Sequence, residues 1–245
     1  MKFWLYGINP VYEALRSSRC QIRDILVAKG KNPQGLEKII EEARSKNIII
    51  EEVERSRLNS ITKSAHHQGI VGLLTHFEYL NLDDVFQKVS GEPLLVVLDG
   101  LEDPRNLGAL IRTANACGVW AVVIPKDRAA GITPVVAKSS AGAVFHTPLV
   151  RVVNIPSALR KLKDRGIWVM GATADAETKI FSQDLRIPLA LVLGGEGKGM
   201  RSLVQRECDF LVSIPMKGKI NSLNVSVAGA VILYEILRQR EKARK

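Results

Sequence analysis

Leu94-Leu95-Val96-Val97-Leu98-Asp99-Gly100 is an uninterrupted apolar run that ends in an acidic residue and a glycine. Such a run is typical of a strand buried on both faces, since a strand with one wet face alternates apolar and polar residues. Comparable runs follow at 121–124, 167–171, 189–193 and 210–214. The segments between them are long enough for helical crossovers. This region therefore predicts an α/β domain with a mostly parallel sheet, whose ligand binds at the carboxyl ends of the strands.

The chain before Leu94 alternates between short strands and helices. Three strands are expected, at 22–28, 48–53 and 70–75. Asn32 is expected to cap a helix that has Pro33 at its first position and runs to about Lys46. These elements predict a second, smaller α/β domain.

The stretch 76–93 is polar and contains one short amphipathic helix, at 82–89. Such composition between two patterned regions is typical of a linker. We therefore divide the chain into an N-terminal domain at 1–76, a linker at 77–93 and a C-terminal domain at 94–245.

The 245 residues carry 35 Lys and Arg against 25 Asp and Glu, a formal net charge of +10. A basic protein gains affinity for a polyanion such as RNA because each neutralised phosphate releases counterions. A generally basic, soluble enzyme fits the same charge. Aromatic residues are only 5% of the chain, which argues against a base-stacking platform for single strands.

Three features bear on the cellular location: the spacing of the cysteines, the N-terminal pattern and the length of the apolar runs. Cys20, Cys117 and Cys208 lie far apart and form no CxxC pair, which favours reduced thiols in the cytoplasm over a zinc site. The N-terminal apolar run is interrupted too early for a signal peptide. No apolar run approaches the roughly 18 residues of a membrane span. We expect a cytoplasmic protein without a membrane partner.

Several familiar site types are excluded by spacing. Neither Gly197-Lys198 nor Gly218-Lys219 is followed by Ser or Thr, so a P-loop is not supported. No GxGxxG follows the first strand of the C-terminal domain. The four histidines lack metal-ligand spacing, and no metal is expected. His66 and His67 are assigned to a solvated loop, with RNA contact as the alternative.

Three segments at strand ends remain as candidates for a site. The first, Asp99-Gly100-Leu101-Glu102-Asp103-Pro104-Arg105-Asn106-Leu107-Gly108, leads into a helix that carries Arg112. Arg105 and Arg112 could meet an anion where the helix N-terminus already favours negative charge. A capped helix with solvated arginines is the alternative interpretation.

The second segment is Leu193-Gly194-Gly195-Glu196-Gly197-Lys198-Gly199-Met200, and the third is Ile214-Pro215-Met216-Lys217-Gly218-Lys219-Ile220-Asn221-Ser222-Leu223-Asn224-Val225-Ser226. Four glycines around Glu196 let the backbone approach a ligand closely. The third segment is expected to open a long helix to about Arg240, with its polar residues in the first turns. Ser222 could be its N-cap, whereas Asn224 is a poor residue for a helix interior.

In this order and at these separations, the three segments resemble the signature motifs of the SpoU (or TrmH) family of 2′-O-ribose methyltransferases. The resemblance covers about 94–239. The first part, with Gly7-Ile8-Asn9-Pro10-Val11 and His67-Gln68-Gly69-Ile70-Val71-Gly72, is similar to the N-terminal RNA-binding domain of one branch. That branch methylates a guanosine ribose in large-subunit (23S) ribosomal RNA.

The resemblance implies a trefoil-knotted methyltransferase domain, a homodimer, ribosomal RNA as partner and S-adenosyl-L-methionine as methyl donor. The cofactor contacts it implies are Thr173, Gly194, Gly195, Ile214 and Leu223. The catalytic and substrate-orienting residues it implies are Asn106, Arg112, Glu196, Ser222 and Asn224. Arg112 matches the family's catalytic arginine. Since a guanidinium stays protonated, we expect it to stabilise the developing alkoxide and to hold a phosphate.

Three other functions stay open. A transfer-RNA 2′-O-methyltransferase uses the same chemistry, although such relatives usually lack this N-terminal domain. A non-catalytic RNA-binding factor for ribosome assembly would also be basic. A methyltransferase that confers resistance by protecting a ribosomal site would share the motifs. The sequence does not identify the nucleotide methylated.

Overall fold

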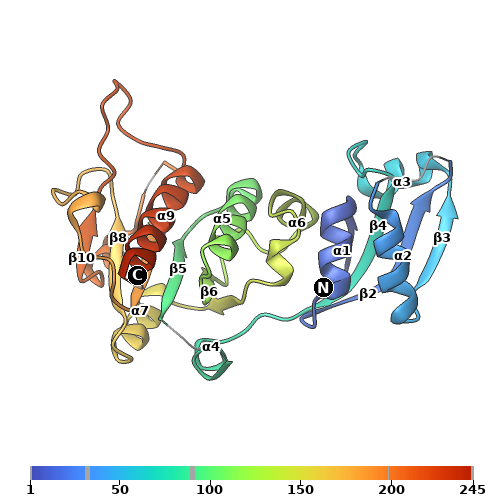
Figure 1. The fold of residues 1–245 in the computed structure, drawn as a ribbon. Coiled ribbons are helices and arrows are strands. Elements are labelled where there is room, and N and C mark those ends of the chain that lie inside the picture. The colour runs from blue at the N-terminus through green and yellow to red at the C-terminus, as the bar shows by residue number, and fades with distance from the viewer. Residues whose placement is uncertain (1, 31–33, 89–91, 198, 244–245) are drawn as a thin grey trace. The chain divides into compact units, whose positions relative to one another are not determined.

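The computed structural model describes residues 2–30, 34–88, 92–197 and 199–243. The chain forms two compact units (Figure 1). Unit 1 consists of Met1–Glu78 with Gly131–His146, and unit 2 consists of Tyr79–Ala130 with Thr147–Lys245. The segment 131–146, which lies far into the sequence of the C-terminal part, thus packs with the N-terminal residues.

Unit 1 is built on a four-stranded sheet in the order β1-β4-β2-β3. Its strands are β1 (Phe3–Tyr6), β2 (Cys20–Ala28), β3 (Ile49–Val53) and β4 (Ile70–Phe77). Only the β2–β3 pair is parallel; β4 pairs antiparallel with both β1 and β2. Its helices are α1 (Ile8–Arg16), α2 (Leu36–Ser45), α3 (Arg55–Thr62), α6 (Pro134–Ser139) and the 3-10 turn η1 (Ala143–Phe145).

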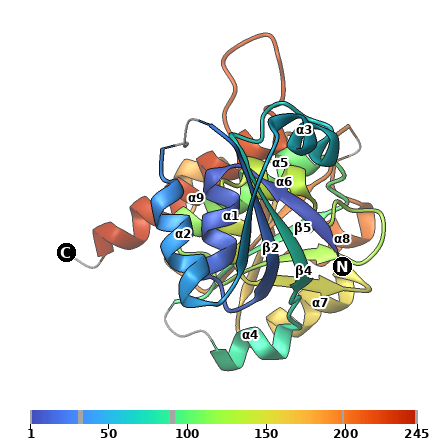
Figure 2. The same ribbon diagram turned by 90° about the vertical axis from the view of Figure 1, so that its right-hand side faces the viewer.

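Helices cover both faces of this sheet. Figure 2 shows α1 and α2 side by side. A Cβ at Gly72 of β4 would lie 3.4 Å from Val11 of α1, so the missing side chain gives the helix room. On the opposite face Leu58 of α3 joins a cluster with Leu26 and Val71. Burial of such residues contributes roughly 1.5–3 kcal/mol each.

The three strands expected from the sequence are confirmed, and β1, α1 and α3 were missed. α1 was missed because Gly7 and Pro10 read as breaks, yet Pro10 lies in the first turn, where a proline is tolerated. The expected cap and first position, Asn32 and Pro33, lie outside the described residues. The described part of that helix begins at Leu36, after Gly35 in the left-handed conformation.

The two N-terminal motifs meet at the start of α1. The Ile8 amide donates to Gln68 Oε1 at 3.2 Å, and Lys138 Nζ donates to the same oxygen at 2.6 Å. The Gly7 amide donates to the Ile70 carbonyl at 3.2 Å. Gly7 has φ +97°, a conformation that favours glycine. These contacts give both motifs a structural role within unit 1.

His67 is buried, so its assignment to a solvated loop was wrong. Its Nδ1 accepts from the Gly69 amide at 3.0 Å, and its Nε2 lies 2.8 Å from Asn59 Oδ1. An amide N–H can only donate, so Nδ1 must be unprotonated and the ring is neutral. Burial, with a smaller contribution from Arg55, lowers the pKa of His67 below 6.5.

Unit 2 contains a six-stranded sheet in the order β10-β8-β9-β5-β6-β7, in which every pair is parallel. Its strands are β5 (Leu94–Asp99), β6 (Ala121–Pro125), β7 (Leu149–Val152), β8 (Trp168–Ala172), β9 (Leu189–Gly194) and β10 (Phe210–Val212). Its helices are α4 (Leu82–Lys88), α5 (Pro104–Ala116), α7 (Ile155–Lys163), α8 (Ser202–Arg206), α9 (Val225–Ala243) and the 3-10 turn η2 (Ile180–Ser182).

Both faces of this sheet are covered, as the run 94–98 predicts; every residue of β5 is buried. Residues of α4, α7 and α8 share one core with alternate residues of the strands. α5 and α9 lie side by side on the other face (Figure 1). A Cβ at Gly229 of α9 would lie 2.4 Å from Leu110 of α5, so this glycine permits the close helix contact.

The expected parallel sheet is confirmed, with two corrections. β10 ends at Val212, two residues before the expected Ile214. β7 was missed because it has only four residues and exposes Arg151. Within the stretch 77–93, Leu80 and Val85 are buried in the core of unit 2, and the division of the chain at this stretch stays a prediction. The trefoil knot stays a prediction. None of the described helices is long and apolar enough to span a membrane.

A neutral, buried His67 predicts a specific loss of stability in mild acid. Because its pKa is lower in the folded than in the unfolded chain, its contribution is complete above about pH 6.5 and is lost as the pH falls toward the folded value. The free energy of unfolding of wild type, measured with urea, should therefore fall below pH 6.5. This fall should be smaller in His67→Gln. His66→Gln is the control and should keep the wild-type decline. An equal decline in His67→Gln would contradict this assignment.

Candidate functional site

The main cavity of unit 2, about 540 Å³, lies at the carboxyl ends of three neighbouring strands. Thr173 follows β8, Gly194 ends β9 and Ile214 follows β10. The segment that leads into α9 closes another side. The volume is in the range of small-molecule and cofactor sites.

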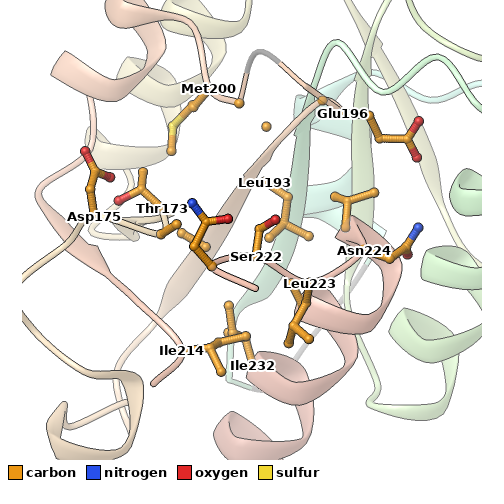
Figure 3. A pocket seen from close by; sticks show the side chains of 18 of the residues that line it. Thr173, Asp175, Leu193, Glu196, Met200, Ile214, Ser222, Leu223, Asn224 and Ile232 are labelled. Carbon is orange, nitrogen blue, oxygen red and sulfur yellow. The ribbon is translucent and has the colours of Figure 1, made fainter. Parts of the chain in front are cut away.

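Eight of the ten residues singled out in the sequence line this cavity. They are Thr173, Gly194, Gly195, Glu196, Ile214, Ser222, Leu223 and Asn224. Figure 3 shows Glu196 and Asn224 at one side of it and Thr173 with Asp175 at the other. Asn106 and Arg112, both on α5, are the two that do not line it.

Asn106 is nevertheless joined to the cavity wall. Its Nδ2 donates to Glu196 Oε1 and, at 3.2 Å, to Asp103 Oδ2. Its Oδ1 accepts from Asn224 Nδ2 at 3.1 Å. Asp103 itself caps α5 by accepting from the Arg105 amide at 2.8 Å. One asparagine thus connects polar residues from all three sequence segments.

Asn224, not Ser222, caps the long helix. α9 begins at Val225, and Asn224 Oδ1 accepts from the Ser226 amide at 2.9 Å and from Ser226 Oγ at 2.6 Å. Asn is favoured at an N-cap, so the expectation of Asn224 inside the first turns was wrong. Its side chain therefore both caps α9 and binds Asn106. Ser222 lies before the helix and is exposed at the cavity.

Gly194 and Gly195 are required by the chain itself. A Cβ on Gly194 would lie 2.2 Å from the Met200 amide nitrogen, and one on Gly195 would lie 2.4 Å from the Gly100 carbonyl oxygen. Both obstacles are backbone atoms, which do not move aside cheaply. The absence of these side chains lets the loop after β9 fold against the end of β5.

Thr173 shows that the cavity can accept a polar ligand group. Its Oγ1 is buried and has no hydrogen-bond partner among the described residues. An unsatisfied buried hydroxyl is costly. A ligand with a polar group at this position would satisfy it. Together with the glycine-lined wall, this fits a small organic molecule with several polar groups.

Arg112 is exposed on α5, seven residues after Arg105. Residues seven apart lie on one helix face, so the two guanidinium groups share a surface. The structure thus separates Arg112 from the residues that line the cavity within this chain. From its position it could meet an anionic molecule at the protein surface.

Sequence reasoning missed Asp99, Met200 and Arg201. Met200 lines the cavity, and Asp99 is a buried carboxylate that binds Arg201. The available signal for Asp99 was its place directly after an apolar run, where an acidic residue at a buried strand end needs a partner. No pattern in the sequence pairs it with Arg201.

Cysteine chemistry does not fit this site. Burial is the main cause that raises the pKa of the Cys208 thiol to about 12. The reactive form of cysteine is the thiolate, so Cys208 is not a nucleophile at neutral pH.

Comparison with known proteins gives a consistent result. Residues 93–234 match the SpoU rRNA Methylase family, and residues 4–80 match the family described as RNA 2′-O ribose methyltransferase substrate binding. The chain belongs to the SpoU rRNA methylase family.

Two curated relatives cover nearly the whole chain. The 23S rRNA (guanosine-2′-O-)-methyltransferase RlmB of Pseudomonas syringae pv. tomato is 41% identical over 98% of this chain and 97% of its own length. The putative TrmH family tRNA/rRNA methyltransferase YacO of Bacillus subtilis is 42% identical over 97% and 96%.

A solved structure has the same fold. It is the SpoU methyltransferase AviRb from Streptomyces viridochromogenes in complex with the cofactor AdoMet, with a TM-score of 0.84 and 26% identity. The match covers 98% of this chain and 91% of that one.

The packing of the glycine-rich loop predicts different tolerance at two glycines. Gly195→Ala places a Cβ against backbone and should reduce the free energy of unfolding by roughly 1–3 kcal/mol. Gly218→Ala is the matched control, since a Cβ there meets nothing within 4 Å and its φ is not positive. Thermal unfolding of both variants is the measurement. Equal stability of the two would show that the loop does not pack as described.

Proposed function

We propose that this protein transfers a methyl group from S-adenosyl-L-methionine to the 2′-hydroxyl of a guanosine ribose in 23S ribosomal RNA. The observation that carries the proposal is the link from Asn106 to Glu196 and Asn224 at the wall of the cavity. It joins the three motif segments at one place. The full-length similarity to RlmB supports the substrate, and the AdoMet complex of AviRb supports the cofactor.

The cavity is the proposed cofactor site. Thr173, Gly194, Gly195, Ile214 and Leu223 would hold S-adenosyl-L-methionine, mainly through backbone groups, with Thr173 Oγ1 as a polar contact. The cofactor supplies a methyl group already activated by a positive sulfonium. The protein's work is therefore largely positioning of the ribose hydroxyl, and no metal is needed.

The substrate-facing residues are assigned from their places around this cavity. Asn106, Glu196, Ser222 and Asn224 would orient the ribose. Arg112 lies outside the cavity, which suits contact with RNA rather than with the cofactor. Its guanidinium would stabilise the alkoxide that forms at the 2′-oxygen and hold an adjacent phosphate. As a permanently charged group it does not accept the proton.

Ribosomal RNA is preferred to transfer RNA because the relative RlmB, named as a 23S rRNA methyltransferase, matches nearly the whole chain. Transfer-RNA enzymes usually lack an N-terminal domain such as the one that residues 4–80 match. Charge alone does not assign RNA capture to this part, since 1–78 has 12 Lys and Arg against 9 Asp and Glu. RNA recognition there would depend on shape and hydrogen bonds as well as on charge. The domain limits 1–76, 77–93 and 94–245 stay part of this proposal.

A homodimer, a knotted C-terminal chain and a cytoplasmic location complete the proposal. Val227 and Tyr234 are exposed apolar residues seven positions apart on α9, so they share one face. Leu223, which precedes α9 and lines the cavity, is also exposed. Burial against a second copy would remove this apolar surface from water beside the site.

Removal of one oxygen atom tests the cofactor site. Thr173→Val keeps the shape but removes Oγ1, so S-adenosyl-L-methionine affinity should fall about three- to tenfold, the loss of one hydrogen bond. Stability should not fall, because Oγ1 has no protein partner among the described residues. Calorimetry with a chelator present measures the affinity, which we expect in the micromolar range for wild type. Binding that requires a metal, or unchanged binding by the variant, would contradict the assignment.

Arg112→Lys tests the geometry of the arginine, because lysine keeps the charge but loses the planar fork. Single-turnover methylation of 23S RNA should fall by roughly two to four orders of magnitude. Cofactor affinity should stay within a few-fold of wild type. Arg160→Lys, on the exposed side of α7, is the control and should methylate normally. Loss of cofactor binding in Arg112→Lys would move this residue into the cofactor site.

Tyr234→Glu tests the dimer, since a charge on a buried apolar contact is strongly unfavourable. The dissociation constant of the dimer should rise at least about tenfold, as measured by sedimentation equilibrium. Trp168→Glu changes another exposed aromatic residue, on β8, and serves as the control. A wild-type monomer at micromolar concentration would refute the dimer.

A further inference from the structure

Asp99 is the most completely buried carboxylate at the site, with none of its side chain exposed. Its Oδ1 accepts from Arg201 Nε at 2.7 Å and from Arg201 Nη2. Its Oδ2 accepts from the backbone amide of Arg201 at 2.8 Å. A buried charge is tolerated only when it is paired and hydrogen-bonded, and Arg201 supplies both requirements.

The same residue also binds the other end of the loop. The Asp99 carbonyl accepts from the Gly195 amide at 2.9 Å. The loop after β9 is thus hydrogen-bonded to Asp99 at both of its ends, at Gly195 and at Arg201. Between these points lie Glu196, which binds Asn106, and Met200, which lines the cavity.

This loop needs such an attachment because glycine has high conformational entropy in the unfolded chain and loses more of it than other residues when the loop is ordered. Gly197 and Gly199 have φ values of +79° and +63°, and a bond from the Gly199 amide to the Gly195 carbonyl at 3.1 Å closes the turn. Arg201 itself is half exposed, with 55% of its side chain accessible. Its contacts with Asp99 therefore order the loop more than they bury the arginine.

We propose that Asp99 and Arg201 are a pair of positioning residues that hold the described residues of this loop, 195–197 and 199–201, in the shape that binds the cofactor. The pair fixes the cavity wall before the cofactor arrives, so that less ordering accompanies binding. It also places the Glu196 carboxylate against Asn106. This inference rests on the proposed use of the cavity by S-adenosyl-L-methionine.

The alternative is a purely structural ion pair. Two variants with uncharged replacements, one single and one double, distinguish a positioning role from a structural one. Arg201→Met leaves a buried carboxylate without its charged partner, so it should lower both the melting temperature and the affinity for S-adenosyl-L-methionine. Asp99→Asn with Arg201→Met removes both charges, so no buried carboxylate is left without its charged partner. A positioning role predicts that the double variant regains the melting temperature but not the affinity.

We expect the dissociation constant for S-adenosyl-L-methionine, measured by calorimetry, to rise at least about tenfold in Arg201→Met and in the double variant, the loss of a charge-assisted contact. Arg201→Lys should bind with intermediate affinity, because it keeps the charge but loses the two-pronged contact. Arg186→Met is the matched control. Arg186 makes a two-pronged contact with Asp184 at 2.8 and 2.9 Å, but both side chains are exposed. Its affinity should be that of wild type.

Hydrogen exchange in the cofactor-free protein gives a second readout. The Gly195 amide donates to the Asp99 carbonyl and the Gly199 amide to the Gly195 carbonyl. In Arg201→Lys and the double variant both amides should exchange faster than in wild type. Folded variants that bind the cofactor within twofold of wild type, or a double variant that regains both affinity and melting temperature, would overturn the proposal. If Arg201→Met does not fold, Arg201→Lys and the double variant still decide the question.

Failure of the proposed cofactor site gives a different result. In that case Thr173→Val and the Arg201 variants would all bind S-adenosyl-L-methionine as wild type does. If only the positioning role is wrong, Thr173→Val would lose affinity while the folded Arg201 variants would not.

Discussion

Asn106 donates a hydrogen bond to Glu196 and accepts one from Asn224, residues that lie 90 and 118 positions away in the sequence. Each partner comes from a different strand end or helix start. The bonds can form only if β5, β9 and the start of α9 meet at one edge of the sheet. The parallel register of β5 with β9, from Leu94 opposite Leu189 to Asp99 opposite Gly194, brings the first two together.

Close backbone packing supplies the rest of this geometry. Gly195 allows the loop after β9 to contact the end of β5, and Gly229 allows α9 to approach α5. The Asn224 side chain then caps α9 while it binds Asn106. The same few residues therefore set both the path of the chain and the shape of the cavity, which explains why glycine and asparagine residues occur in these segments.

The sequence predicted those features that depend on local pattern. The run 94–98 identified a strand buried on both faces, and the polar and glycine residues at strand ends identified the cavity wall. The sequence left Ser222 as a possible N-cap of α9 and placed Asn224 in its first turns, although Asn and Ser are equally good caps. The hydrogen bonds from Ser226 to Asn224 Oδ1 show that Asn224 is the cap. Long-range pairs such as Asp99 with Arg201, and the packing of 131–146 with unit 1, leave no periodic signal in one sequence.

His67 shows the same limit on a smaller scale. A polar run before a strand is typical of a loop, yet the imidazole is buried because the Gly69 amide and Asn59 satisfy both ring nitrogens. Nothing in the run 64–69 indicates those partners. Local chemistry thus predicted where polar residues lie, whereas tertiary contacts decided which of them face solvent.

We propose that the linked residues Asn106, Glu196 and Asn224 form the site of a 23S RNA 2′-O-methyltransferase. Unmodified 23S ribosomal RNA and transfer RNA, each incubated with the protein and S-adenosyl-L-methionine, can be mapped for ribose methylation at nucleotide resolution. We expect one methylated guanosine in 23S RNA, no methylation of transfer RNA, and loss of the 23S methylation in Asn106→Ala. Methylation confined to transfer RNA, or an Asn106→Ala variant with the wild-type rate, would contradict it.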